Sequence, residues 1–264
     1  MTRILHLSDT HFGTERPQVV DALIALAHTL SPQLIVVSGD ITQRATRAQF
    51  AAARRFLEAL PPCPRLLLPG NHDIPLLALW QRALSPYARY RAGLGVDALA
   101  PMLSLPGVHA VAVKTTRRRR HIDGEVSPAQ IEAVAATLRA LPAADLKLVV
   151  THQPLWVDRA DDQHNRCRGA DAALAAWVAA GADLCLAGHI HWPFAARLPQ
   201  ARAAWAINAG TAVSKRVRPG APNSVNLIEW SSAQGERLCR WTRYDCAADG
   251  EPFLPLTPTP LALA

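Results

Sequence analysis

The segment Ile4-Leu5-His6-Leu7-Ser8-Asp9-Thr10-His11 joins a short apolar run to a polar cluster that contains metal-ligating side chains. The apolar part has the composition of a buried strand, and the polar part follows it directly. The same arrangement recurs after four later apolar runs, and the polar clusters there are Gly39-Asp40, Gly70-Asn71-His72-Asp73, His152 and Gly188-His189-Ile190-His191. Because open α/β sheets gather ligand-binding groups at the carboxyl ends of their strands, we expect all five clusters to converge in space.

Helical segments alternate with these strands, which favours an α/β architecture. The segments Thr46-Arg47-Ala48-Gln49 and Ser127-Pro128-Ala129-Gln130 match capping boxes and predict helix starts. We expect these two helices to end near Leu60 and Leu141. Another helix is expected from Val19 to Leu30, and a fourth over residues 171–180. The strands expected in this part of the chain are Ile4–Leu7, Leu34–Val37, Arg65–Leu68, Val108–Val113, Leu146–Val150 and Leu184–Leu186, with helices and loops over residues 76–108.

The last part of the chain has a different pattern, with strands that no helices separate. Ala204–Ile207, Ser224–Trp230 and Leu238–Tyr244 have strand character, and we expect the strands of residues 203–244 to complete the second of two sheets. Residues 251–264 contain four prolines and predict an extended C-terminal tail. Since no internal repeat or composition shift marks a boundary, we expect one domain over residues 1–250, followed by the tail 251–264.

Length and composition favour a globular protein with a large core. The chain has 264 residues, of which 50% are hydrophobic, and chains of this size bury roughly three-quarters of their unfolded surface. The apolar runs are far shorter than the roughly 20 residues that cross a bilayer, and the N-terminus does not resemble a signal peptide. We therefore expect a cytoplasmic protein with no membrane partner. The sequence carries no signal for its oligomeric state.

Cysteine content and charge bear on cofactors and partners. The five cysteines are scattered and form no CxxC motif, which argues against a disulfide framework and against a cysteine-based zinc site. The formal net charge is +7, and five basic residues fall between Lys114 and Arg120. This run could bind nucleic acid, but no aromatic residues are interleaved to stack on bases, which favours a solvated basic loop.

The side chains of the five clusters indicate the type of metal that they could bind. Carboxylates and neutral imidazoles suit Mn²⁺, Fe, Zn²⁺ or Co²⁺, and no thiolate is needed. The glycines that precede Asp40, Asn71 and His189 permit tight turns and close backbone approach. The residues alone therefore predict a site for divalent metal ions.

The order D-x-H, G-D, G-N-H-D, H and G-H-x-H resembles the signature of the calcineurin-like metallophosphoesterase superfamily. The resemblance spans residues 9–191 and is strongest to bacterial class III cyclic-nucleotide phosphodiesterase-like proteins. It implies a four-layer αββα sandwich with two mixed β-sheets. It also implies two divalent metal ions, one bound by Asp9, His11, Asp40 and His191, the other by Asp40, Asn71, His152 and His189, with Asp40 bridging them. His72 would contact the phosphate or protonate the leaving group, and Asp73 would orient His72.

The resemblance implies a metal-dependent hydrolase, and we expect a small phosphodiester, such as a cyclic nucleotide, as its substrate. Two dications, two aspartates and one hydroxide shared by the ions sum to +1, which matches the single charge of a diester. The residues expected to contact substrate are Asn71, His72, Arg44 and His164. A nuclease, a phosphomonoesterase and a non-enzymatic scaffold remain as alternatives with the same fold.

Overall fold

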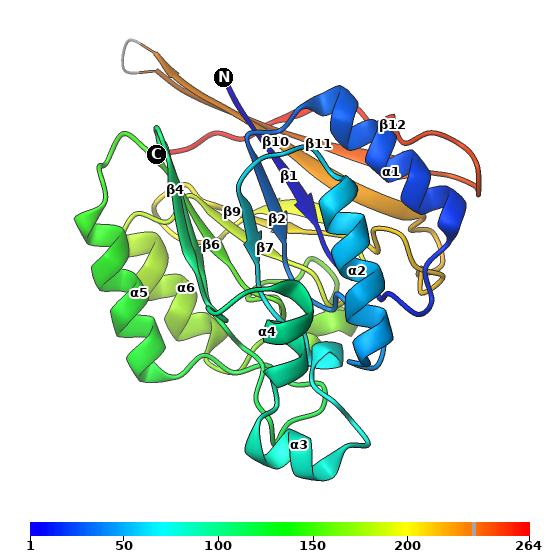
Figure 1. The fold of residues 1–264 in the computed structure, drawn as a ribbon. Helices are drawn as coiled ribbons and strands as arrows, with labels where there is room; N and C mark the ends of the chain where they lie inside the picture. Colours follow the sequence, from blue (N-terminus) through cyan, green and yellow to red (C-terminus); the bar gives the residue numbers. More distant parts are fainter. Residues whose placement is uncertain (234–235) are drawn as a thin grey trace.

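Two β-sheets stack face to face with helices on both outer sides, in the computed structural model of the chain (Figure 1). The structure describes residues 1–233 and 236–264. The first sheet has the strand order β12-β11-β10-β1-β2-β3, with β13 also pairing with β11. Its strands are β1 (Thr2–Leu7), β2 (Leu34–Val37), β3 (Arg65–Leu67), β10 (Asn223–Ala233), β11 (Glu236–Cys246), β12 (Leu254–Pro255) and β13 (Thr259–Pro260).

The second sheet has the order β4-β5-β6-β7-β9-β8. Its central strands run parallel, and its edge pairs β4–β5 and β8–β9 are antiparallel. The first sheet combines parallel pairs, β1–β2 and β2–β3, with antiparallel pairs, β1–β10 and β10–β11, so both sheets are mixed. These strands are β4 (Met102–Leu105), β5 (Val108–Ala112), β6 (Leu146–Val150), β7 (Leu184–Ala187), β8 (Phe194–Arg197) and β9 (Trp205–Asn208). The predicted four-layer αββα class is therefore confirmed.

The longer helices cover the outer faces of the two sheets. They are α1 (Pro17–Leu30) and α2 (Arg47–Ala59) on the first sheet, and α5 (Pro128–Ala140) and α6 (Ala170–Ala179) on the second. The capping boxes at Thr46 and Ser127 are confirmed, since each hydroxyl accepts a hydrogen bond from the backbone N–H three residues later. Residues 76–108 form the short helices α3 (Leu79–Leu84) and α4 (Ala88–Leu94) and the unexpected strand β4.

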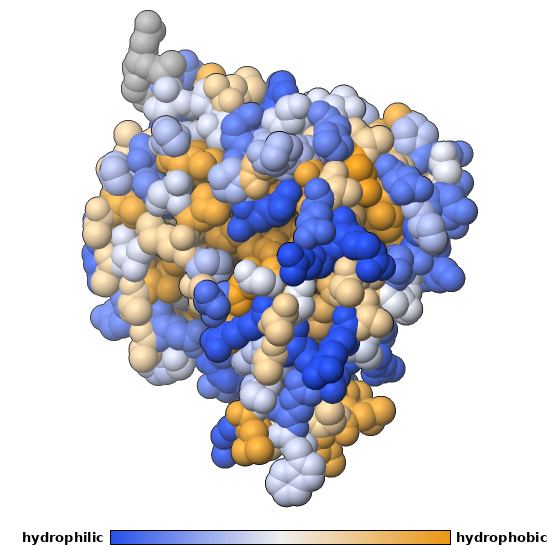
Figure 2. Space-filling model, viewed as in Figure 1, coloured by the Kyte–Doolittle hydropathy of each residue, from blue (hydrophilic) through white to orange (hydrophobic). Residues whose placement is uncertain are grey.

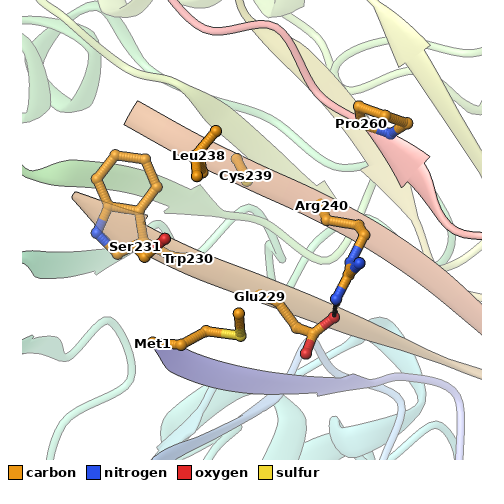
Figure 3. Close-up of a pocket in the computed structure, with 8 residues that line it drawn as sticks. All are labelled: Met1, Glu229, Trp230, Ser231, Leu238, Cys239, Arg240 and Pro260. Carbon is orange, nitrogen blue, oxygen red and sulfur yellow. Dashed lines mark hydrogen bonds and ion pairs between the residues drawn. The ribbon is translucent and has the colours of Figure 1, made fainter. Parts of the chain in front are cut away.

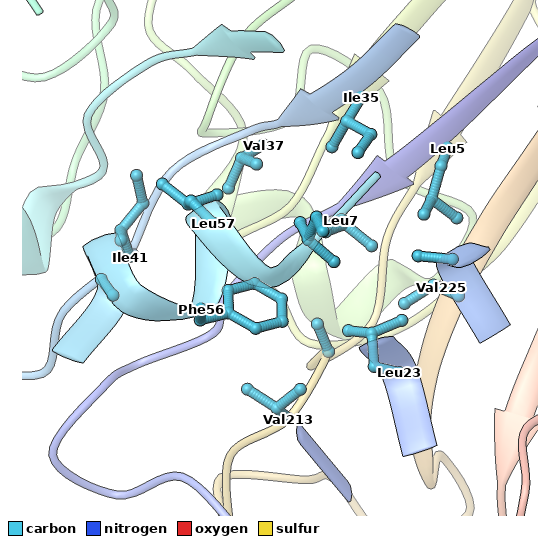
Figure 4. Close-up of a cluster of buried hydrophobic side chains, with 14 of the residues drawn as sticks. Leu5, Leu7, Leu23, Ile35, Val37, Ile41, Phe56, Leu57, Val213 and Val225 are labelled. Atoms are coloured by element: carbon cyan, nitrogen blue, oxygen red, sulfur yellow. The ribbon is translucent and has the colours of Figure 1, made fainter. Parts of the chain in front are cut away.

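Successive side chains of a strand point to opposite faces of its sheet, and the buried hydrophobic ones form three clusters, one outside each sheet and one between the sheets. On β1, Leu5 and Leu7 face α1 and α2, where they pack with Phe56 and other side chains (Figure 4). Ile4 points the opposite way, into the layer between the sheets, where it meets side chains such as Leu148 of β6. Each fully buried side chain of this size contributes about 1.5–3 kcal/mol to folding. This packing fixes β1 and, with it, the position of the polar cluster that follows.

The placement of β10 and β11 corrects one expectation. Both strands belong to the first sheet, where β10 pairs antiparallel with β1 and β11 pairs with β10, and only β9 of the later predicted strands joins the second sheet. Strands β10 and β11 lie on the side of β1 opposite to β2. The alternation of residues within a strand does not specify which sheet edge the strand pairs with. Residues 251–264 follow as an extended segment, in which β12 and β13 pair with β11.

Within the described residues, no helix combines the length and apolar character needed to cross a bilayer. The five cysteines are free thiols.

Candidate metal centre

The five polar clusters meet where parallel strands of the two sheets end. Asp9 and His11 follow β1, Asp40 follows β2, and Asn71 begins a 3₁₀ turn, η1 (Asn71–Asp73), after β3. From the second sheet, His152 follows β6, and His189 and His191 follow β7. The predicted convergence is observed, because six of these side chains form two groups, each with potential ligand atoms within 4.8 Å of one another, and a third group, His11, Asp40 and His72, links the two.

The backbone at this centre is held in an unusual conformation. Five of the candidate ligands are non-glycine residues with positive φ: Asp9 (53°), His11 (43°), Asp40 (48°), His189 (71°) and His191 (54°). Such a conformation costs of order 1–3 kcal/mol per residue and persists only where the surroundings enforce it. Because five candidate ligands share this conformation, the rest of the fold must stabilise it, and the conformation brings their side chains together.

Two glycines allow the segments to approach closely. A Cβ atom on Gly188 would lie 1.9 Å from Ser8 Oγ and 2.4 Å from Asp9 Oδ2, and one on Gly70 would lie 2.1 Å from Asp40 Oδ1. Both positions therefore exclude a side chain. The occurrence of glycine directly before a candidate ligand therefore has a steric cause at these two positions.

The first group consists of Asp9, His11 and His191. Asp9 Oδ1 lies 3.2 Å from His191 Nε2 and 3.5 Å from His11 Nε2. Asp9 is fully buried, and among the described residues Oδ1 has no hydrogen-bond donor. Since a buried carboxylate oxygen without a partner is costly, this atom fits the role of a metal ligand.

The second group consists of Asp40, His152 and His189. His152 Nε2 lies 3.3 Å from Asp40 Oδ1 and 3.1 Å from Asn71 Oδ1. The other carboxylate oxygen, Asp40 Oδ2, lies 3.7 Å from His11 Nε2 of the first group. Asp40 thus presents one oxygen to each group, which is the arrangement that a bridging ligand requires.

Hydrogen bonds on the outer ring nitrogens set the orientation of two histidines. His152 Nδ1–H donates to the carbonyl of Ser38 at 2.8 Å, and His191 Nδ1–H donates to the carbonyl of Arg216. Each bond turns Nε2 toward the carboxylates. Metal-binding histidines in proteins are commonly held in this way.

The electrostatics of the centre favour ionised carboxylates. Burial opposes ionisation of Asp9 and Asp40, but the nearby histidines, chiefly His191 and His152 respectively, outweigh it and lower the pKa of both carboxyls. Burial and the charge of His152 lower the pKa of His189 to about 3, which keeps that ring neutral. Two ionised carboxylates among imidazoles are a donor set that fits divalent cations.

His72 and Asp73 have different surroundings from those expected. His72 Nδ1–H donates to the carbonyl of Gln43 at 2.9 Å, and its ring lies edge-on to His11. Asp73 is fully buried and accepts from the backbone N–H groups of Ile41, Thr42 and Gly70. The expectation that Asp73 orients His72 is therefore wrong. The carbonyl of Gln43 holds the ring, whereas Asp73 holds the loop that carries Asp40.

A cavity of about 630 Å³ opens over the metal-binding groups. Arg44, Asn71 and His72, three of the residues expected to contact substrate, line it. His164 does not: it is exposed in the 3₁₀ segment η2 (Ala160–Asn165), and its neighbour Asn165 faces the cavity instead. The lining residues that the sequence did not point to are Gln43, His121, Ile122, Asp162, Arg216 and Arg218.

Two of these unpredicted residues are arginines with different partners. Arg218 is neutralised, because its Nη1 lies 2.9 Å from Asp162 Oδ1. Arg216 Nη1 lies 3.1 Å from His72 Nε2 and 3.2 Å from Gln43 Oε1, and no carboxylate in the described part of the chain lies within ion-pair distance of it. Arg216 is therefore a cation that is free to bind an anion in the cavity.

Another cavity, of about 240 Å³, lies by the opposite end of β1 (Figure 3). It is lined by residues such as Met1, Trp230 and Leu238, and its two charged side chains, Glu229 and Arg240, pair with each other at 2.7 Å. It lacks the convergent ligands of the first cavity, which is the candidate functional site.

The fold and the two metal-binding groups define a class, that of αββα proteins with a candidate dinuclear metal centre. The model of the calcineurin-like phosphoesterase family matches residues 2–193, and the chain belongs to this family. Arg216 and Arg218 lie beyond the matched residues.

Individual proteins resemble the chain over all or part of its length. The chain is 36% identical over 81 residues to the glycerophosphodiester phosphodiesterase GpdQ of Enterobacter lignolyticus (strain SCF1), a match that covers 26% of this chain and 29% of that relative. The structure of purple acid phosphatase PPD1 from yellow lupin superposes with a TM-score of 0.73 at 11% identity, over 95% of this chain and 52% of that one. A dimetal phosphatase from Danio rerio gives a TM-score of 0.63 at 14% identity, over 100% and 99% of the two chains. At these identities the solved structures show the fold alone.

Proposed function

We propose that the chain hydrolyses a small phosphodiester at a dinuclear metal centre. The observation that carries the proposal is the pair of ligand groups joined by Asp40, together with the unpartnered, buried oxygen of Asp9. When bound, two divalent ions would polarise the phosphoryl group and make a water molecule acidic enough to act as nucleophile near neutral pH. The candidate ligands are Asp9, His11, Asp40 and His191 for one ion, and Asp40, Asn71, His152 and His189 for the other.

The chain's own residues would position the substrate. Arg216 and Arg44 line the same cavity as the metal-binding groups, and Arg216 can donate to a phosphoryl oxygen near His72. His72 is held through Nδ1, so its Nε2 is the ring nitrogen that would contact the leaving oxygen, and it would donate a proton there when both ring nitrogens are protonated. Asn165 takes the place of His164 as a candidate substrate contact from the η2 segment.

The preference for a diester rests on the resemblance to diesterases and on the partial match to GpdQ. A cyclic nucleotide remains the substrate that we favour within this class. One observation favours a phosphomonoester instead. Arg216 adds a positive charge to the sum of +1 expected from the ions, the two aspartates and a hydroxide, and the resulting +2 matches the dianion of a monoester.

The test compares hydrolysis of bis-p-nitrophenyl phosphate and p-nitrophenyl phosphate by metal-stripped protein reconstituted with Mn²⁺. The proposal predicts metal-dependent turnover with the higher kcat/KM for the diester. A higher value for the monoester would make the protein a phosphatase. No turnover of either compound, in protein that holds its metal, would refute phosphoester hydrolysis as the general activity.

A further inference from the structure

The segment between Asp73 and Asp123 has an unusual charge balance. It contains eight lysines and arginines, and its single acidic residue is Asp97; the basic residues are Arg82, Arg89, Arg91, Lys114, Arg117, Arg118, Arg119 and Arg120. In the folded chain, this segment includes α3, α4 and the basic loop that follows β5. A strongly positive region of this kind attracts anionic surfaces.

The same segment exposes large apolar side chains on a projection that we call the tip, residues 76–85. Four of its side chains, Leu77, Leu79, Trp80 and Leu84, are 71–87% exposed. Figure 1 shows α3 protruding from the body of the molecule, and Figure 2 shows hydrophobic side chains gathered at that end. Single exposed apolar residues are common, but a cluster of this size on a projection marks a contact surface.

Contacts tie the tip to the basic loop. Arg118 Nη1 donates to the carbonyl of Ala83, and Arg82 Nη2 donates to the carbonyl of Arg120 at 2.8 Å. Arg117 and Arg120 form ion pairs with Glu125, at 3.7 and 3.2 Å. Arg118 and Arg119 are exposed and have no acidic partner among the described residues, so their charges are available at the base of the tip.

We propose that the tip, with Arg118 and Arg119, docks the protein on an anionic phospholipid surface. Leucine and tryptophan side chains insert at the boundary between headgroups and acyl chains, while arginines beside them attract anionic lipids. This proposal revises the expectation, drawn from the lack of a membrane-spanning segment, that the protein has no membrane partner.

Two other occupants fit the observations less well. In a symmetric dimer the tip would face its own copy, and the unpaired arginines of both copies would lie together. A nucleic acid would bind the arginines through its phosphates but would leave the three exposed leucines in water. A lipid surface accommodates both the charges and the apolar side chains.

Docking would also bring the catalytic cavity close to the membrane. His121 and Ile122, which directly follow the basic loop, line that cavity. The docking itself does not depend on the proposed phosphodiesterase activity, so the two can fail separately.

The experiment is co-sedimentation of the metal-loaded protein with vesicles of phosphatidylcholine, alone or mixed with phosphatidylglycerol. We expect binding to the mixed vesicles, little binding to phosphatidylcholine alone, and weaker binding as salt is raised. Arg118→Gln/Arg119→Gln should weaken binding about 25-fold, from roughly five-fold for each arginine near an anionic surface. Leu79→Ser/Trp80→Ser should weaken it by about ten-fold or more.

A matched control is Arg55→Gln/Arg139→Gln, which removes the same charge from exposed positions on α2 and α5. This control should bind as the wild type does. Unchanged thermal unfolding of all three variants shows that they are folded. The proposal is overturned if the wild-type protein does not distinguish the two kinds of vesicle, or if both tip variants bind like the control. It is also overturned if Leu79→Ser/Trp80→Ser turns a dimer into a monomer without lipid, because the tip then binds a second copy.

Discussion

Asp73→Asn should destabilise the protein strongly and impair metal binding, although Asp73 contacts neither candidate metal group. Its carboxylate accepts four hydrogen bonds: Oδ1 accepts from the N–H and the hydroxyl of Thr42, and Oδ2 accepts from the N–H groups of Ile41 and Gly70. These bonds join the loop after β2, which carries Asp40, to the turn after β3. All four partners donate, and an ionised carboxylate can accept all four hydrogen bonds because neither of its oxygens carries a hydrogen.

The expected magnitude follows from this geometry. An asparagine amide has only one oxygen, so its NH₂ group would face two donors and two hydrogen bonds to a charged acceptor would be lost. Each such bond contributes about 1.5–3 kcal/mol, which gives a loss of roughly 3–6 kcal/mol in the free energy of unfolding. Burial and the charge of Asp40 raise the pKa of Asp73 to about 7, above its value in the unfolded chain. The wild type therefore loses stability as pH rises toward 7, and its advantage over Asp73→Asn should be smaller above that pH than at pH 4.

The assay is urea unfolding of the protein in chelator at pH 8, where metal loss cannot contribute to the result. Asp97→Asn is the matched control, because Asp97 is exposed. Metal content is measured separately on reconstituted protein and should fall in Asp73→Asn. Wild-type stability and metal content, combined with a kcat as low as that of a His72 variant, would refute the reasoning and restore an orienting role for Asp73.

Two further predictions concern histidines. His72→Ala should lower kcat by about 10²–10⁴-fold while leaving the metal content, measured by elemental analysis, close to that of the wild type; loss of metal would instead make His72 a ligand. Burial lowers the pKa of His6 to about 3, so between pH 6.5 and 3 the unfolded chain binds one more proton at this site and the folded state loses stability as pH falls. His6→Gln should flatten this dependence by about 1.4 kcal/mol per pH unit in urea unfolding of the metal-free protein; an unchanged slope would contradict a neutral, buried His6.

Features with a local cause could be predicted from the sequence. The capping boxes at Thr46 and Ser127 involve groups three residues apart, and the helices begin where these predict. The convergence of the polar clusters was also predictable, because parallel strands end at the same edge of a sheet. The sheet to which β10 and β11 belong was not, since any strand with the right alternation can pair with either free edge.

The rest of the cavity depends on contacts between distant segments. Arg216 comes from the loop between β9 and β10, and it reaches His72 across 144 positions of the chain. In the η2 segment, helical rotation turns Asn165 toward the cavity and leaves His164 exposed. The sequence pattern predicts neither the path of a loop nor which side chains of a short 3₁₀ turn face the cavity.

The central claim is that Asp40 joins two metal-binding groups into one centre for phosphoester hydrolysis. The most direct measurement is the number of Mn²⁺ ions bound by wild-type protein and by Asp40→Ala at equilibrium, with turnover of bis-p-nitrophenyl phosphate recorded on the same samples. We predict two ions and turnover for the wild type, and loss of both ions and nearly all turnover for the variant. Two ions and wild-type turnover in Asp40→Ala would contradict the claim.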